Sequence, residues 1–253
     1  MKPSVAGMTL VVLLATACGD GAENETEQQT LTVFAAASLT EAFTQIGSDF
    51  EADHPSLEVR FSFGPSDGLA TQIQEGAPAD VFASASPTWM DAVAGDPGIT
   101  NRTDFARNLL VVITPADDPA GIESVEDLVK PGVKLVLAAE GVPVGDYARE
   151  MLSNAGVADD ALANLVSNED DVKGVVQKVA LGEADAGVVY RTDVTGNVGN
   201  DLRTIEIPGD DNVVATYPIG VVEGSETDLA SAFVTHVVGP GRDRLEAAGF
   251  LPP

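Results

Sequence analysis

The pentapeptide GPSDG at residues 64–68 has the pattern G-x-S-x-G. In serine hydrolases this pattern forms a sharp turn between a strand and a helix and exposes a nucleophilic serine, here Ser66. A catalytic triad would also need a histidine, and the chain has two. His236 lies in a helical pattern rather than on a loop, and His54 precedes Ser66 in the chain. Ser66 is therefore either a catalytic nucleophile or part of a binding site where no covalent bond forms.

Four junctions between a predicted strand and a predicted helix have the composition of anion-binding turns. A helix N-terminus offers backbone N–H groups without internal partners and the positive end of the helix dipole. In parallel α/β sheets such junctions gather at the carboxyl ends of the strands, where ligands bind. The four segments could together bind an oxyanion without lysine or arginine: AAASLTEAF (35–43), GPSDGLA (64–70), GVPVGDYA (141–148) and NEDDVKGV (168–175).

Strand and helix patterns alternate from residue 31 onward, which predicts an α/β fold with mostly parallel sheets flanked by helices. Apolar or alternating runs predict strands at 30–34, 57–63, 80–84, 108–114, 133–138, 186–190, 203–207 and 217–222. Helical spacing of apolar residues predicts helices at 39–50, 68–76, 123–129, 146–154, 171–181, 228–238 and 242–248.

The N-terminus has the pattern of an export signal. Its apolar run at residues 8–17 is too short to span a bilayer but has the length of a signal-peptide core. The run ends in the sequence ATAC (15–18), which resembles the cleavage box of bacterial lipoproteins, in which Cys18 is lipidated, although Ala15 stands where leucine is usual. We expect a signal peptide at 1–17 and a lipidated cysteine with a flexible acidic tether at 18–30. Ordinary secretion with cleavage nearby is the alternative.

The composition excludes several classes of partner. The chain has 13 Lys and Arg against 40 Asp and Glu, a formal net charge of −27, whereas nucleic acids and anionic membranes attract clustered cations. Membrane association is expected only through the lipid anchor. Two distant histidines and a single cysteine offer no metal-cation site, and we expect neither a cofactor nor an intrachain disulfide.

Several sequence blocks resemble, in order, those of the molybdate-binding proteins that feed ABC transporters. They are LTVFAAASLTEAF, LATQIQEGAPADVFASA, NLLVV, VPVGDYARE and DDVKGVVQKVALGEADAGVVY. The resemblance runs from Leu31 to the final GF and implies a type II, two-lobed periplasmic solute-binding fold. Two mixed, mostly parallel sheets flanked by helices would be joined by two crossover strands. Lobe I would comprise residues 31–112 and 217–253, and lobe II residues 113–216.

The resemblance also implies a set of ligand residues. The hydroxyls of two serines and a tyrosine, and the backbone N–H groups of two valines, would bind the anion: Ser38, Ser66, Tyr190, Val144 and Val172. Other roles stay open for some of them. Ser38 with Glu41 fits a capping box, S-x-x-E, Ser66 could be a turn or cap residue, and Tyr190 could be a buried structural tyrosine.

The function implied is that of an exported, monomeric lipoprotein that is not an enzyme. It would capture molybdate or tungstate in the interlobe cleft and deliver it to an ABC permease and its ATPase. Asp67, Asp146 and Asp171 flank the donor positions, and we expect their carboxylates to point outward. A carboxylate pointing inward would repel a dianion or favour a protonated oxyanion such as phosphate. Sulfate or phosphate binding, or a serine hydrolase using Ser66, are the alternatives.

Overall fold

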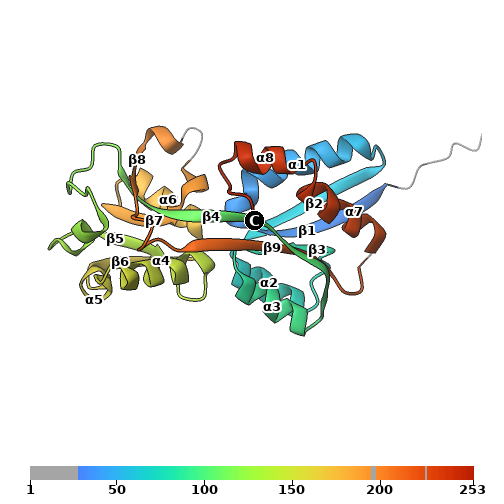
Figure 1. Ribbon diagram of the computed structural model, residues 1–253, viewed down its shortest axis with the longest axis horizontal. Coiled ribbons are helices and arrows are strands. Elements are labelled where there is room, and N and C mark those ends of the chain that lie inside the picture. Colours follow the sequence, from blue (N-terminus) through green and yellow to red (C-terminus); the bar gives the residue numbers. More distant parts are fainter. Residues whose placement is uncertain (1–27, 195–197, 226) are drawn as a thin grey trace, which may run out of the picture.

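The computed structural model describes residues 28–194, 198–225 and 227–253. The expected signal peptide, Cys18 and most of the expected tether lie outside these residues. The described chain forms two α/β halves that lie side by side along the long axis of the molecule (Figure 1). None of the described helices is long and apolar enough to cross a lipid bilayer.

The first half, on the right of Figure 1, combines the N-terminal strands with the C-terminal helices. Its strands are β1 (Gln29–Ala36), β2 (Leu57–Gly64) and β3 (Val81–Ala83), and the short helix η1 (Ala37–Leu39) follows β1. One face of this sheet is covered by α1 (Thr40–Asp53), α7 (Thr227–Val238) and α8 (Arg242–Ala247), and the other by α2 (Ser66–Gln74) and α3 (Pro87–Gly95).

The second half has the same layered plan. Its strands are β5 (Leu135–Ala138), β6 (Leu165–Glu169), β7 (Ala186–Tyr190) and β8 (Leu202–Glu206). Helix α6 (Val172–Ala180) lies on one side, and α4 (Pro143–Asn154) and α5 (Ala158–Leu162) lie on the other (Figure 1). Short helices η2 (Val125–Val129), η3 (Arg191–Asp193) and η4 (Val198–Asn200) complete the half. Every residue of β5 and β7 is buried, as expected for strands covered on both faces.

Two strands, β4 (Ile99–Pro115) and β9 (Val214–Val222), connect the halves. The first part of β4 pairs with β9, and its last part pairs with β7 and β8. The hydrogen-bonded order is β2-β1-β3-β9-β4-β7-β5-β6, with β8 on β4, so the two expected sheets are joined into one mixed sheet. The expected lobe boundaries after residues 112 and 216 fall inside these two strands and stay a prediction.

Parallel pairing is confined to the separate halves. The pairs β1–β2, β1–β3, β5–β6 and β5–β7 are parallel, and every antiparallel pair among the described strands involves β4 or β9. The parallel strands therefore end beside the boundary between the halves, and the loops after them run into helix N-termini there.

Besides the short helices η3 and η4, three elements lie where the sequence patterns predicted none: α3, α5 and β6. Helix α3 has clear start signals, since the Ser86 side chain accepts a hydrogen bond from Thr88 N at 3.1 Å and Pro87 is its first residue. It buries Met90 and Val93 in a small apolar cluster beneath α2. The helix expected at 123–129 is the 3-10 helix η2.

Candidate functional site

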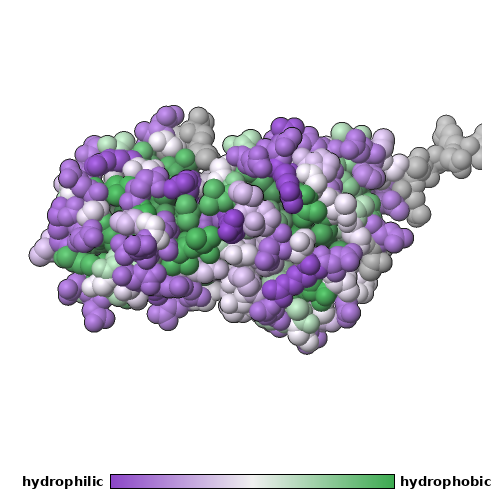
Figure 2. All heavy atoms as spheres, in the orientation of Figure 1, coloured by the Kyte–Doolittle hydropathy of each residue, from purple (hydrophilic) through white to green (hydrophobic). Residues whose placement is uncertain are grey.

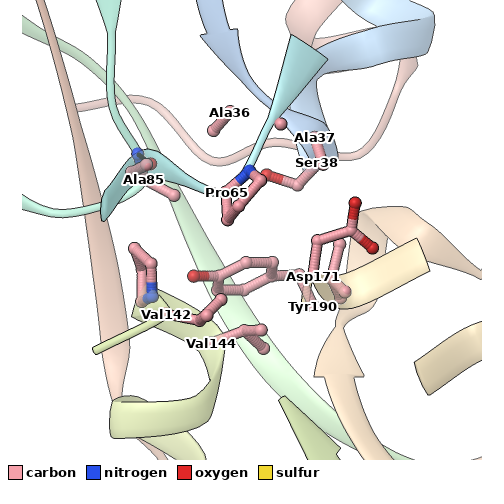
Figure 3. A pocket seen from close by; sticks show the side chains of 13 residues that line it. Ala36, Ala37, Ser38, Pro65, Ala85, Val142, Val144, Asp171 and Tyr190 are labelled. Carbon is pink, nitrogen blue, oxygen red and sulfur yellow. Dashed lines mark hydrogen bonds between the residues drawn. The ribbon is translucent and has the colours of Figure 1, made fainter. Parts of the chain in front are cut away.

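A small cavity lies between the two halves, and all five expected ligand residues line it. About 20 Å³ is open there to the centre of a water-sized sphere. Figure 3 shows Ser38 and Pro65 on one side of the Tyr190 ring and Val142 and Val144 on the other. The lining is Ala36, Ala37, Ser38, Gly64, Pro65, Ser66, Ala85, Val142, Pro143, Val144, Asp171, Val172 and Tyr190.

The cavity walls are the strand-to-helix junctions expected from the sequence. The β1–η1 and β2–α2 junctions come from the first half, and the starts of α4 and α6 come from the second. The first N–H groups of a helix have no intrahelical acceptor, so each start directs donors and a partial positive charge toward the cavity. No lysine or arginine belongs to the lining. Apart from Asp171, the polar groups of this site are therefore neutral hydrogen-bond donors.

Ser38 faces a second hydroxyl rather than capping a helix. Its side chain is buried, and its Oγ lies 3.0 Å from the hydroxyl of Tyr217 on β9. Ser38 belongs to η1, whereas Leu39 occupies the N-cap position of α1 and no side chain caps that helix. The capping-box interpretation is therefore wrong, because Glu41 forms an ion pair with Lys173 instead.

Ser66 is the first residue of α2 and is 1% exposed. Its Oγ accepts a hydrogen bond from Ala85 N at 3.0 Å, which leaves the hydroxyl proton available for donation. Neither histidine lines the cavity: His54 Nδ1 lies 2.8 Å from the carbonyl of Phe50, and the His236 ring packs against the Phe50 ring. Neither histidine is therefore placed to act as the base of a triad with Ser66.

Tyr190 ends strand β7 and places its phenol in the cavity (Figure 3). The side chain is 2% exposed, and its hydroxyl has no hydrogen-bond partner of good geometry among the described residues. Burial, together with neighbouring Tyr217, raises the pKa of Tyr190 well above its usual value, so the phenol stays protonated. A buried hydroxyl whose neighbour Tyr217 is poorly aligned to bond it is costly, and this favours a ligand that accepts its hydrogen bond.

Val144 and Val172 are buried near the starts of α4 and α6. Pro143 is the first residue of α4 and has no N–H group, so Val144 provides the first donor of that helix. The two valine side chains supply apolar walls, while their N–H groups belong to the helix ends.

The three flanking carboxylates differ in position. Asp146 is exposed, and its Oδ1 accepts a hydrogen bond from Gly141 N at 2.9 Å. Asp67 also lies outside the cavity lining, but its Oδ1 is buried without a hydrogen-bond partner among the described residues, so this carboxylate does not point fully outward. Asp171 does line the cavity, but its carboxylate has the helix-capping role expected of it. Its Oδ1 caps α6 by accepting from Gly174 N at 2.9 Å, and Figure 3 shows the carboxylate turned away from the Tyr190 hydroxyl.

Sequence reasoning missed the residues that support the lining. Tyr217 and Ala85 hold the two serine hydroxyls, and Lys173 lies directly after Val172 with its ammonium between Glu41 and Asp193. Burial raises the pKa of Asp193 to about 6 even though Lys173 acts to lower it. No signal in the sequence marks these contacts, because each joins residues far apart in the chain. The described residues contain no group of three or more His, Cys, Asp or Glu that could hold a metal ion.

Comparisons with known proteins agree with this geometry. Residues 31–251 match the family model of bacterial extracellular solute-binding proteins. The molybdate-binding protein ModA of Mycobacterium bovis is 40% identical over 228 residues, which cover 89% of this chain and 85% of that protein. ModA of Escherichia coli is 35% identical over 218 residues, 83% of this chain and 84% of that protein.

The fold is also that of a solved structure, the periplasmic molybdate-binding protein of Azotobacter vinelandii. The TM-score is 0.76 at 21% identity, and the match covers 88% of this chain and 99% of that chain. The chain therefore belongs to the bacterial extracellular solute-binding proteins and, within them, to the family of these molybdate-binding proteins.

Proposed function

We propose that this protein is an exported receptor that captures molybdate in the cavity between its halves and does not act as an enzyme. One observation carries the proposal: the buried hydroxyl of Tyr190, which makes no well-formed hydrogen bond with the described residues, lies in a cavity whose other polar walls are serine hydroxyls, helix N-termini and Asp171. The 40% identical molybdate-binding protein supports molybdate as the oxyanion.

The donor set suits a tetrahedral dianion. Three hydroxyls and the backbone N–H groups of two helix starts would bind it: Ser38, Ser66, Tyr190, Val144 and Val172. Hydrogen bonds to a charged group contribute roughly 1.5–3 kcal/mol each. Five or more could leave about 8–12 kcal/mol after the cost of association, which corresponds to micromolar to nanomolar affinity. The same donors fit tungstate.

A second oxyanion is favoured by one specific observation. Asp171 lines the cavity, and its carboxylate, once turned inward, could accept the proton of monohydrogen phosphate. Molybdate has no such proton at neutral pH. The orientation of Asp171 therefore decides between the two ions.

Binding would stabilise a closed arrangement of the halves. The serine donors come from the first half and the other donors from the second, so an anion held by both links them. A ligand shifts such an equilibrium by its differential affinity for the two forms. The closed form would present molybdate to an ABC permease and its ATPase.

The receptor would stay outside the cytoplasm as a monomer, anchored by a lipid on Cys18. The export signal and the cysteine after its apolar core support this placement. Mass spectrometry of the membrane-extracted protein tests it. A mature N-terminus other than a lipidated Cys18 would contradict the anchor.

Calorimetric titration of residues 19–253 at pH 7.5 with molybdate, tungstate, sulfate and phosphate tests the function. We expect tight binding of the first two ions and at least about 100-fold weaker binding of the others. Preference for phosphate, abolished by Asp171→Asn, would assign the cavity to a protonated oxyanion. The absence of measurable binding for all four ions would overturn the proposal.

A further inference from the structure

One ion pair crosses between the two halves at the rim of the cavity. Lys173 Nζ, at the start of α6 in the second half, lies 3.1 and 3.0 Å from the two carboxylate oxygens of Glu41 on α1 in the first half. Every other ion pair among the described residues joins groups of the same half.

The ion pair lies next to the walls that would hold the anion. Lys173 directly follows Val172, and Glu41 lies one helical turn after Ser38. Helix α6 also contacts η1, so these two segments approach each other beside the cavity. The electrostatic attraction between Glu41 and Lys173 therefore draws together two walls of the cavity, the one that holds Ser38 and the start of α6 at Val172.

The position of Lys173 is fixed from within its own half. Its ammonium lies 3.2 Å from Oδ1 of Asp193 on η3, whose side chain is fully buried. Both residues belong to the second half, so this contact does not depend on closure. Asp193 thereby holds the Lys173 side chain in place, which lowers the entropy lost when Glu41 joins it.

We propose that Lys173 is a positioning residue for anion capture: held by Asp193, it binds Glu41 when the halves close and slows release of the bound anion. It contacts the partner half and not the anion, because Lys173 is absent from the cavity lining. The inference rests on the proposed function, since it assumes an anion that both halves bind.

A built-in probe can report closure. Trp89 is the only tryptophan of the chain, and its Nε1 donates a hydrogen bond to the carbonyl of Gly141 at 2.8 Å, from α3 of the first half to the second half. Stopped-flow tryptophan fluorescence with molybdate as the probe ion therefore measures association and dissociation rates in residues 19–253.

The decisive variant is Glu41→Gln, which keeps the Lys173–Asp193 contact. Asp53→Asn is the matched control, because it removes one negative charge from the exposed end of the same helix without touching the rim. We expect Glu41→Gln to release molybdate about two- to fivefold faster, as for a partly exposed ion pair. Its association rate should be no slower than that of the control, and the difference in release should shrink at about 1 M salt.

A double-mutant cycle with Lys173→Met extends the test. The change in release rate on Glu41→Gln should vanish in the Lys173→Met background. Equal release from Glu41→Gln and Asp53→Asn would overturn the inference while leaving molybdate binding intact. Binding by calorimetry without any fluorescence change would overturn the closure on which it depends. A wild-type protein that binds no molybdate in either measurement would instead refute the proposed function and the inference with it.

Discussion

At the scale of single residues, four buried hydroxyls at the site have different hydrogen-bonding states. The hydroxyls of Ser38 and Tyr217 bond each other, Ser66 Oγ accepts from a backbone N–H group, and the Tyr190 hydroxyl has no partner of good geometry among the described residues. A polar atom kept buried without a partner destabilises the free protein. Tyr190 is therefore the residue at which ligand affinity and stability should separate most clearly.

Tyr190→Phe should weaken molybdate binding and leave the free protein as stable or more stable. Loss of one hydrogen bond to a charged ligand costs about 1.5–3 kcal/mol, or roughly 10- to 150-fold in Kd, whereas removal of an orphaned hydroxyl relieves a desolvation cost. Tyr217→Phe is the matched control, since it removes the partner of Ser38 and should lower stability by about 0.5–1.5 kcal/mol. Calorimetry and thermal unfolding without ligand measure both. A Tyr190→Phe protein that binds normally would refute the role of the phenol.

Asp193 should make stability fall with rising pH. Burial raises its pKa from 3.8 to about 6 in the folded protein, so between these values the folded state binds more protons than the unfolded state. The contribution of Asp193 to the free energy of unfolding is fully present below about pH 4, where the carboxyl is protonated. It is lost as the pH rises through 6, by about 3 kcal/mol in total. Thermal unfolding of wild type and Asp193→Asn between pH 4 and 8 measures this. Relative to wild type, the free energy of unfolding of Asp193→Asn should increase with pH up to about pH 7. A difference between the two proteins that does not depend on pH would contradict the raised pKa of Asp193.

At the scale of elements, the helix starts must approach the strand ends closely to bring their N–H groups to the cavity. Gly145 in the first turn of α4 shows how closely: a Cβ there would lie 2.2 Å from the carbonyl oxygen of Ala139 and 2.5 Å from that of Ala138. Those atoms are backbone at and just after the end of β5, so they cannot turn aside. Any larger residue must push the α4 start, and Val144 with it, out of position.

Gly145→Ala should therefore lower both stability, by about 1–3 kcal/mol, and molybdate affinity. Gly95→Ala is the matched control, because that glycine ends α3 with no atom near its Cβ position, and it should be neutral or stabilising by up to about 1 kcal/mol. Urea unfolding and calorimetry measure the two effects. Normal affinity in Gly145→Ala would show that the α4 start does not set the site.

The elements also show what the sequence could predict. Strand-to-helix junctions have local signatures, so the cavity walls at Ser38, Ser66 and Val172 could be located from apolar periodicity and helix starts. The continuity of the sheet through β4 and β9 could not, because antiparallel pairing of distant strands leaves no local pattern. Helix α3 was missed although Ser86 and Pro87 mark its start, whereas β6 has only two apolar residues, Leu165 and Val166, and shows no period.

The contacts that hold the cavity residues in place could not be predicted from local sequence patterns either. Tyr217 lies on β9, far in sequence from the serine that it contacts, and the Glu41–Lys173 pair joins residues 132 apart. Ser38 shows the opposite case: S-x-x-E spacing fitted a capping box as an alternative role, but the fold uses the serine and the glutamate for two other contacts. Tertiary contacts replaced a plausible local one.

At the scale of the whole molecule, an acidic protein would capture a dianion. The net charge is −27, and Figure 2 shows hydrophilic residues spread over the visible face of both halves. Exposed charges act over about 10 Å at 0.1 M salt. The surface charge should therefore oppose the approach of molybdate, while the buried neutral donors hold it after closure.

Association of molybdate should accelerate with ionic strength. Screening weakens the repulsion, so the association rate should rise roughly three- to tenfold between about 10 mM and 0.3 M sodium chloride. Stopped-flow fluorescence of Trp89 measures it. An association rate that falls with salt would indicate local attraction by cations that the cavity lining does not contain.

The most direct measurement of the central claim is a crystal structure of the protein with molybdate, with anomalous scattering used to locate molybdenum. The account predicts one strong anomalous peak in the cavity between the halves, within hydrogen-bond reach of the hydroxyls of Ser38, Ser66 and Tyr190 and of the starts of α4 and α6. A peak elsewhere, or an anion held by a lysine or arginine side chain, would contradict the account.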